Sequence, residues 1–287
     1  AAANSRLEEK VQVRTAALQE ANAQIMYLNT QLQAENNRMG AELEVTRRLQ
    51  QLMLPKAEEL EQISGLEIAG FMEAAHEVGG DYYDVIDGDR FVTIGIGDVT
   101  GHGLESGVLM IMAQTAVRTL LAVGENNPQR FLGALNTVVY QNGQRLSLGR
   151  QMTLTLLTYE SDCLSITGQH EEVLLFRRDG SVEQVDTLEL GLPLGLLEDI
   201  TAFVGQVQVQ LYPGDGVVLY TDGVTEAANL HRQLYGCDRL IALIQANWHH
   251  SAAVIRQIVV EDIRSHIGNS PLCDDITLVV LKKCLKT

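Results

Sequence analysis

Four aspartates in this sequence stand at the edges of apolar, strand-like runs, beside glycine or other small residues. They are Asp81 in GGDYYD, Asp98 in GIGDVTGHG, Asp222 in LYTDGVTEA and Asp274 in CDDITLVV. Asp and Gly at strand ends are ordinary turn formers, so each motif alone has a purely structural explanation. Together the four motifs place carboxylates at the ends of strands far apart in the sequence, and these ends could converge on one rim of a sheet.

Carboxylates gathered at one rim would repel one another unless cations neutralised them. An oxygen-only ligand set favours a hard divalent ion such as Mg²⁺ or Mn²⁺, because softer metals prefer thiolate or imidazole ligands. Two such ions that share a bridging carboxylate can activate a water molecule and orient it toward a phosphoryl group. This chemistry needs no nucleophilic Ser or Cys, and the sequence contains no GxSxG, GxxxxGK[ST] or CxxxxxR motif.

The composition excludes several classes of function. A formal charge of −16 over 287 residues repels nucleic acid backbones and anionic membrane surfaces, so we expect no nucleic acid partner. No apolar run approaches the ~20 residues of a membrane span, so we expect no membrane insertion. The 4 cysteines are scattered without metal-ligand spacing and are expected to be reduced thiols, which favours a cytoplasmic location.

The segment from Leu7 to about Met53 is expected to form one long helix, since it has no proline and a single glycine. Of the seven positions spaced seven apart from Val11, six are apolar, whereas the alternate series that begins at Leu7 is mixed. Such a narrow stripe suits a two-helix seam and predicts a parallel homodimer through residues 1–55; the alternative is a helix lying against the chain's own globular part. Pro55 ends the helix, and residues 56–64 form an acidic connector.

Beyond residue 65 the pattern changes to short runs rich in Val, Ile, Thr and Leu, separated by Gly and Asp. These runs predict strands over 66–73, 91–97, 152–160, 172–178, 203–211, 216–221 and 276–282. Helix-length segments lie between them, at 104–122, 128–145, 236–247 and 251–267. The pairs Asp87-Gly88 and Asp179-Gly180 predict hairpin turns, so we expect an α+β fold with antiparallel sheets rather than alternating parallel units.

Over residues 47–281 the sequence resembles the PPM metal-dependent protein phosphatases, and specifically their SpoIIE and RsbU branch of bacterial signalling phosphatases. The ordered motifs GGDYYD, GDVTGHG, GLPLG, LYTDGVTEA and DDITLVV carry the resemblance, together with the lead-in LQQLMLP. The resemblance implies an α-β-β-α sandwich of two antiparallel sheets flanked by helices over residues 65–287. It also implies a dinuclear Mn²⁺ or Mg²⁺ site at one end of the sandwich and a serine/threonine phosphatase activity.

The same resemblance implies a role for each acid. Asp98 would bridge both cations, and Asp81 with the backbone carbonyl of Val99 would complete the second site. Asp222 and Asp274 would hold the first cation. The acids considered as supporting candidates are Asp275, Asp84 and Asp89. The imidazole of His102 could protonate a leaving serine oxygen, or it could only stabilise its own loop.

The better-known eukaryotic members place a phosphate-binding arginine where this sequence has Glu77, so affinity would come from docking of a whole protein. Within this branch the usual substrates are phosphorylated STAS-domain anti-sigma-factor antagonists. Because the sequence opens inside a helical pattern, we expect an upstream sensory or receiver domain. Two alternatives are a catalytically inactive pseudophosphatase scaffold and a phosphatase of broader substrate range.

Overall fold

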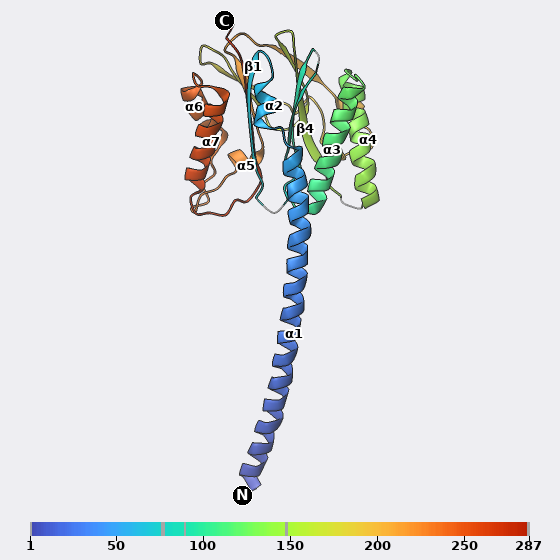
Figure 1. Cartoon of the computed structure of the whole chain (residues 1–287), viewed down its shortest axis with the longest axis vertical. Helices are drawn as coiled ribbons and strands as arrows, with labels where there is room; N and C mark the ends of the chain where they lie inside the picture. The colour runs from blue at the N-terminus through green and yellow to red at the C-terminus, as the bar shows by residue number, and fades with distance from the viewer. Residues whose placement is uncertain (1, 76–77, 89, 147–148, 286–287) are drawn as a thin grey trace. The chain divides into compact units, whose positions relative to one another are not determined.

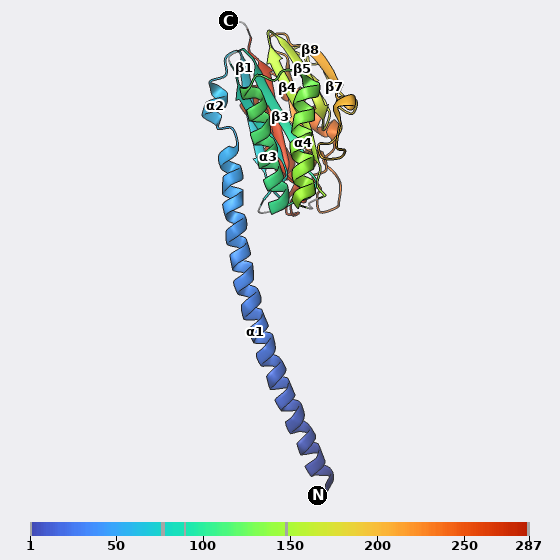
Figure 2. The same cartoon turned by 90° about the vertical axis from the view of Figure 1, so that its right-hand side faces the viewer.

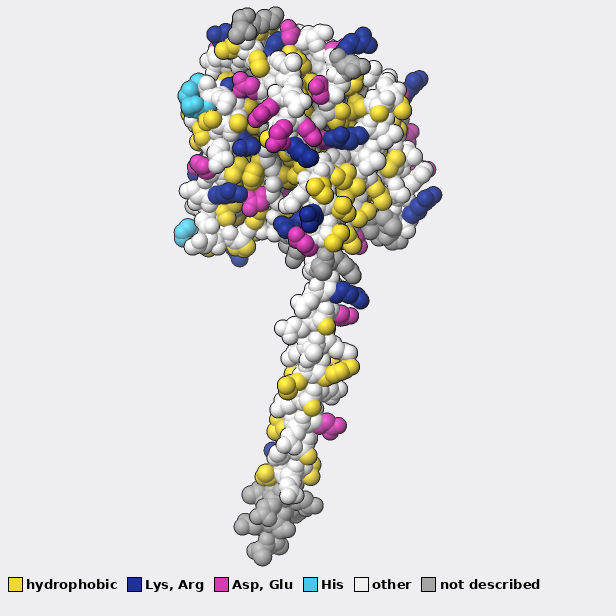
Figure 3. All heavy atoms as spheres, viewed as in Figure 1, with side chains coloured by type: hydrophobic (Ala, Val, Ile, Leu, Met, Phe, Trp, Pro, Cys, Tyr) yellow, Lys and Arg dark blue, Asp and Glu magenta, His cyan; other side chains and the backbone are white. Residues whose placement is uncertain are grey.

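The structure, a computed structural model, describes residues 2–75, 78–88, 90–146 and 149–285 (Figure 1). It contains two compact units, residues 1–45 and 46–287. The first unit belongs to helix α1 (Ala2–Met53), which confirms the predicted long helix. Apolar side chains along α1 are exposed in the single chain (Figure 3), with exposed fractions of 57% for Val11, 55% for Ile25 and 60% for Leu32.

Two antiparallel five-stranded sheets form the centre of the second unit (Figure 2). The strand order is β1-β10-β9-β6-β7 in the first sheet and β2-β3-β4-β5-β8 in the second. The first sheet contains β1 (Leu66–Glu73), β10 (Ile276–Lys283), β9 (Gly216–Tyr220), β6 (Val173–Phe176) and β7 (Val182–Val185). The second sheet contains β2 (Tyr82–Asp87), β3 (Val92–Val99), β4 (Met152–Glu160), β5 (Cys163–Gln169) and β8 (Gln206–Gln210).

Two pairs of helices cover the outer faces of the sheets (Figure 1). Helices α6 (Cys237–Asn247) and α7 (Ala252–Ile267) pack on the first sheet, and α3 (Leu104–Ala122) and α4 (Pro128–Leu146) pack on the second. A third apolar core fills the space between the sheets. The short elements are α2 (Ala57–Glu61), η1 (Thr201–Phe203) and α5 (Asp222–Thr225). This layering confirms the predicted α-β-β-α sandwich.

The predicted strands and helices correspond to observed elements, but three strands were missed. They are β2, β5 and β7, whose sequences are YYDVID, CLSITGQ and VEQV. Each is short or interrupted by polar residues, so none shows a strong apolar run. The connector expected over 56–64 contains α2, and its residues Leu60 and Ile63 pack into the core between the sheets. In the described part of the chain, no helix has the length and apolarity required to cross a membrane.

Candidate metal centre

Strand pairing brings the four predicted aspartates to one end of the sandwich. In the second sheet, Asp81 directly precedes β2 and Asp98 lies near the end of β3, and the antiparallel pairing sets Tyr82 opposite Gly97. In the first sheet, β9 ends two residues before Asp222, and Asp274 precedes β10 by two residues. Because β9 and β10 are also antiparallel, these two acids lie at the same edge.

The carboxylate of Asp81 joins the two sheets. Its side chain is 1% exposed, and its Oδ2 atom accepts hydrogen bonds from Thr221 Oγ1 at 2.9 Å and Thr277 Oγ1 at 2.5 Å. Thr221 follows β9 and Thr277 lies at the start of β10, both in the first sheet, whereas Asp81 precedes β2 of the second sheet. Sequence reasoning missed these two residues, although they stand inside the LYTDG and DDIT motifs beside the predicted acids.

The aspartates act on one another electrostatically. Burial raises the pKa of Asp98 to about 7, and the charges of Asp222, Asp274 and Asp275 add to this effect. Burial also raises the pKa of Asp81 well above its usual value, with the Asp98 charge as the next cause. The pKa of Asp222 is raised by burial and then by Asp274. The cluster therefore favours a bound proton or a bound cation over free carboxylates.

The oxygen atoms that surround Gly80 are ligands of the type that a hard cation prefers. A Cβ atom on Gly80 would lie 2.5 Å from the Val99 carbonyl oxygen and 3.1 Å from both Asp98 Oδ1 and the Gly101 carbonyl oxygen. Three oxygens thus border one small space that glycine leaves open. As the side chains lie, no three His, Cys, Asp or Glu residues in the described ranges are close enough to hold a metal ion. A cation would have to draw the carboxylates inward.

Two supporting candidates have structural partners of their own. The Asp275 carboxylate accepts hydrogen bonds from the backbone nitrogens of Ala75 at 2.8 Å and Gly80 at 2.7 Å, so it fixes the segment that leads to Asp81. Asp84 is fully buried, and its two oxygens pair with the guanidinium of Arg118 at 2.7 Å each. Asp84 therefore lies in an ion pair rather than in the cluster. The predictions for Glu77 and Asp89 fall outside the described residues.

The GDVTGHG loop is held by an arginine that sequence reasoning missed. Arg150, two residues before β4, donates from Nη1 to the Thr100 carbonyl at 2.5 Å and pairs with Glu105 of α3 at 3.1 Å. Gly101 has a φ of +77°, and a Cβ there would lie 1.7 Å from Arg150 Nη1, so only glycine admits this contact. His102 is exposed in the same loop.

The last turns of α1 contact the candidate centre. Gln50 is 3% exposed; its side-chain amide donates to the Gly79 carbonyl at 3.2 Å and accepts from the Gly79 nitrogen at 3.3 Å. Gln114 of α3 donates to the Met53 carbonyl at 2.9 Å. The helix end is thereby bonded both to the segment before Asp81 and to the helix that follows the GDVTGHG loop.

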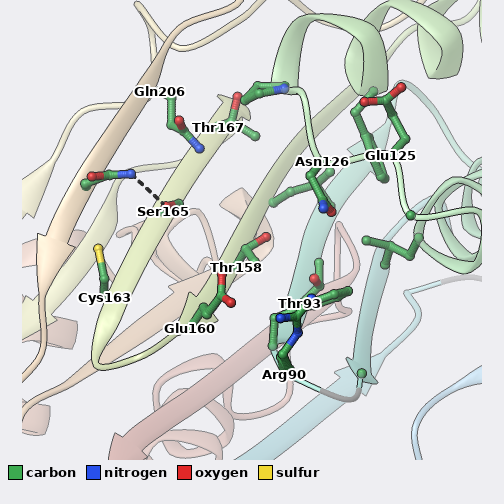
Figure 4. A pocket seen from close by; sticks show the side chains of 18 residues that line it. Arg90, Thr93, Glu125, Asn126, Thr158, Glu160, Cys163, Ser165, Thr167 and Gln206 are labelled. Carbon is green, nitrogen blue, oxygen red and sulfur yellow. Dashed lines mark hydrogen bonds between the residues drawn. The ribbon is translucent and has the colours of Figure 1, made fainter.

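A pocket of about 680 Å³ lies elsewhere, on the outer face of the second sheet (Figure 4). Its lining includes Thr93, near the start of β3, and Thr158, near the end of β4. Hydroxyl and amide side chains line its floor, and Gln208 donates to Ser165 at 3.5 Å. Asp98 lies near the opposite end of β3, so the pocket is separate from the aspartate cluster.

Residues 88–283 match the family model described as Stage II sporulation protein E (SpoIIE), which is more than half of the chain. The chain belongs to the SpoIIE family. This SpoIIE-family chain is 28% identical over 247 residues to the phosphoserine phosphatase RsbU of Bacillus subtilis (strain 168), with 85% of the chain and 70% of RsbU covered. It is 24% identical to the protein IcfG of Synechocystis sp., where 84% of the chain covers only 41% of IcfG.

The SiaA-PP2C domain of Pseudomonas aeruginosa has the same fold, with a TM-score of 0.74 at 21% identity over 87% of this chain and 98% of that domain. Relatives of this SpoIIE-family domain are named as a phosphoserine phosphatase, RsbU, and as a PP2C domain, which supports a protein serine/threonine phosphatase. Phosphatases of this family are metal-dependent. The resemblance to the SpoIIE and RsbU branch, predicted from the five ordered motifs, is confirmed.

Proposed function

We propose that this domain removes phosphate from serine or threonine of a partner protein with the help of two divalent cations, Mn²⁺ or Mg²⁺. The observation that carries the proposal is the cluster of four aspartates at one end of the sandwich, with raised pKa values for Asp81, Asp98 and Asp222. Asp98 would hold both cations, and the Val99 carbonyl would complete the second site. When bound, the cations would supply an activated water and positive charge for the phosphoryl oxygens.

The protein's own groups would set the geometry of this site. Asp81 is kept in place by Thr221 and Thr277, which restrict its carboxylate to one orientation. Arg150 restrains the loop that carries His102. The exposure of His102 leaves its imidazole accessible to a phosphorylated side chain, so we propose that it gives a proton to the leaving oxygen.

The proposed substrate is a phosphorylated STAS-type antagonist protein in the cytoplasm, and the proposed input is an upstream sensory or receiver domain. Similarity to RsbU, a phosphoserine phosphatase, supports a signalling substrate. The raised pKa values support a metal-dependent enzyme over an inactive scaffold, because an unneutralised cluster of buried acids is costly to keep.

We expect release of phosphate from candidate phosphorylated STAS proteins in the presence of Mn²⁺ and none after chelation. The measurement is phosphate release from each phosphoprotein, with p-nitrophenyl phosphate as a substrate that needs no docking. Turnover of p-nitrophenyl phosphate without turnover of any STAS protein would refute the substrate class but not the activity. No metal-dependent turnover of either would favour the pseudophosphatase scaffold.

We propose a homodimer through residues 1–55, and predict that the full chain with Ile25→Glu and Leu32→Glu will be monomeric. Both side chains are exposed and belong to the series of positions spaced seven residues apart from Val11. A charge at such a position destabilises the pairing of two helices. The control is Met26→Glu, which changes an equally apolar side chain with 71% exposure outside that series. Light scattering gives the masses. Identical masses for all three proteins would refute this role of the linker.

A further inference from the structure

His170 lies next to the aspartate cluster but is absent from the motifs discussed above. It directly follows β5, and its Nδ1 atom is 2.8 Å from Thr153 Oγ1. Thr153 Oγ1 in turn donates to the backbone carbonyl of Asp98 at 3.3 Å. Thr153 and Asp98 are directly opposed in the β3–β4 ladder. A chain of two hydrogen bonds therefore joins the imidazole to the backbone of the proposed bridging acid.

The backbone at His170 is anchored by Thr187. The His170 backbone nitrogen donates to Thr187 Oγ1 at 3.0 Å, and the Thr187 hydroxyl also contacts the His170 carbonyl. His170 is half-buried as a residue, yet its Nε2 atom is inaccessible and has no hydrogen bond of normal geometry in the part of the chain that is described. Burial lowers the pKa of His170 to about 4, so the ring is neutral near pH 7.

The other sheet acts on the ring through the backbone of Tyr220, which raises the pKa of His170 and so opposes the effect of burial. Tyr220 is the last residue of β9 and is followed by Thr221 and Asp222. The ring is thus linked to Thr153, which opposes Asp98 in the second sheet, and to the Tyr220 backbone, which leads to Asp222 in the first sheet.

We propose that His170 and Thr153 are positioning residues for the metal centre, an inference that rests on the function proposed above. A hydroxyl donates one hydrogen bond, so Thr153 donates to the Asp98 carbonyl only when Nδ1–H of the ring donates to the hydroxyl. The buried imidazole therefore sets the direction of the Thr153 hydroxyl. That hydroxyl restrains the Asp98 backbone, and with it the angle at which the Asp98 carboxylate leaves β3.

A matched control exists on the same strand. Thr155 is fully buried, lies two residues beyond Thr153, and donates from Oγ1 to the Gly168 carbonyl at 3.2 Å. Its hydrogen bond is of the same kind as that of Thr153, from a threonine hydroxyl to a backbone carbonyl, but it is more deeply buried and Gly168 is not a proposed ligand. Removal of the Thr155 hydroxyl reports the cost of losing a buried hydrogen bond in β4, without any effect through Asp98.

The experiment uses the full chain with Thr153→Val, Thr153→Ser, His170→Leu, His170→Asn and Thr155→Val. Calorimetric titration gives the Mn²⁺ affinity, and the thermal midpoint of the metal-free protein gives stability. We expect Thr153→Val and His170→Leu to weaken Mn²⁺ binding about 10-fold, the usual effect of losing a partner of a metal ligand. Thr153→Ser and His170→Asn, which keep the hydroxyl and a donor near Nδ1, should restore most of the affinity.

The double variant Thr153→Val with His170→Leu should bind Mn²⁺ no more weakly than the worse single variant, because both act through one chain of hydrogen bonds. Equal affinities for Thr153→Val and Thr155→Val would overturn this inference and leave the metal centre intact. If the unaltered chain binds no Mn²⁺, the proposed function itself fails. If His170→Leu does not fold, the volume-conserving Thr153→Val variant still decides.

Discussion

Replacing Asp98 with Asn should lower kcat/KM for Mn²⁺-dependent hydrolysis of an aryl phosphate by at least about 100-fold. A neutral amide cannot bridge two cations as a carboxylate does, and the amide nitrogen would face positive charge. The fold should survive, since the backbone pairing of β3 with β4 does not depend on this side chain. The measurements are the Mn²⁺ titration of activity and the Mn²⁺ affinity by calorimetry.

The same variant should change how stability depends on pH in the metal-free protein. The folded-state pKa of Asp98 is about 7, above its usual value of 3.8, so this carboxyl destabilises the fold progressively as pH rises through 7. Asn removes that contribution, so the metal-free variant should be at least as stable as the unaltered chain at pH 8. Thermal midpoints at pH 5 and pH 8 test the sign.

The control for both measurements is Asp87→Asn. Asp87 is an exposed acid at the far end of β2, so its loss removes the same charge without touching the cluster. We expect activity, Mn²⁺ affinity and stability close to those of the unaltered chain. Wild-type activity of Asp98→Asn at saturating Mn²⁺ would show that Asp98 is not the bridge.

The sequence was sufficient for elements whose signal is local. The apolar runs of β1, β4 and β10, the helical lengths of α3 and α7, and the turn at Asp179-Gly180 all follow from nearest-neighbour patterns. Strand β2 was missed because its sequence, YYDVID, includes a buried acid. That acid, Asp84, is tolerated in a strand only because Arg118 of α3 pairs with it, a contact that no local pattern records.

The residues of the candidate site also fall into those that local motifs predict and those that only long-range contacts reveal. The four principal aspartates were found because each stands beside glycine or a strand end in a recognisable motif. Their partners were not, since Thr221, Arg150 and His170 act through contacts between segments far apart in the chain. For Asp81, the sequence indicated an acid beside two glycines, whereas burial against two threonines of the other sheet explains its fixed orientation.

Replacing Gln50 with Leu should lower the apparent Mn²⁺ affinity and the turnover rate by about 10-fold each, the usual scale for losing a group that supports a metal ligand. The Gln50 amide forms two hydrogen bonds with the Gly79 backbone, two residues before Asp81. Leucine has similar volume but cannot satisfy either backbone group, so the buried Gly79 nitrogen and carbonyl would lose their partner. The control is Gln51→Leu at the exposed neighbouring position.

This contact gives a physical route for regulation by the linker, which we propose as a bias on a two-state equilibrium. The polar residues Arg14, Glu35 and Glu42 weaken the predicted seam, so two packings of paired α1 helices can differ by only a few kcal/mol. Rotation of α1 would move Gln50 relative to Gly79, and Met53 relative to Gln114 of α3. Chains locked in different coiled-coil registers should therefore differ in Mn²⁺ titration and rate. If every register gives the same values, and Gln50→Leu behaves like Gln51→Leu, the linker serves only to hold a dimer.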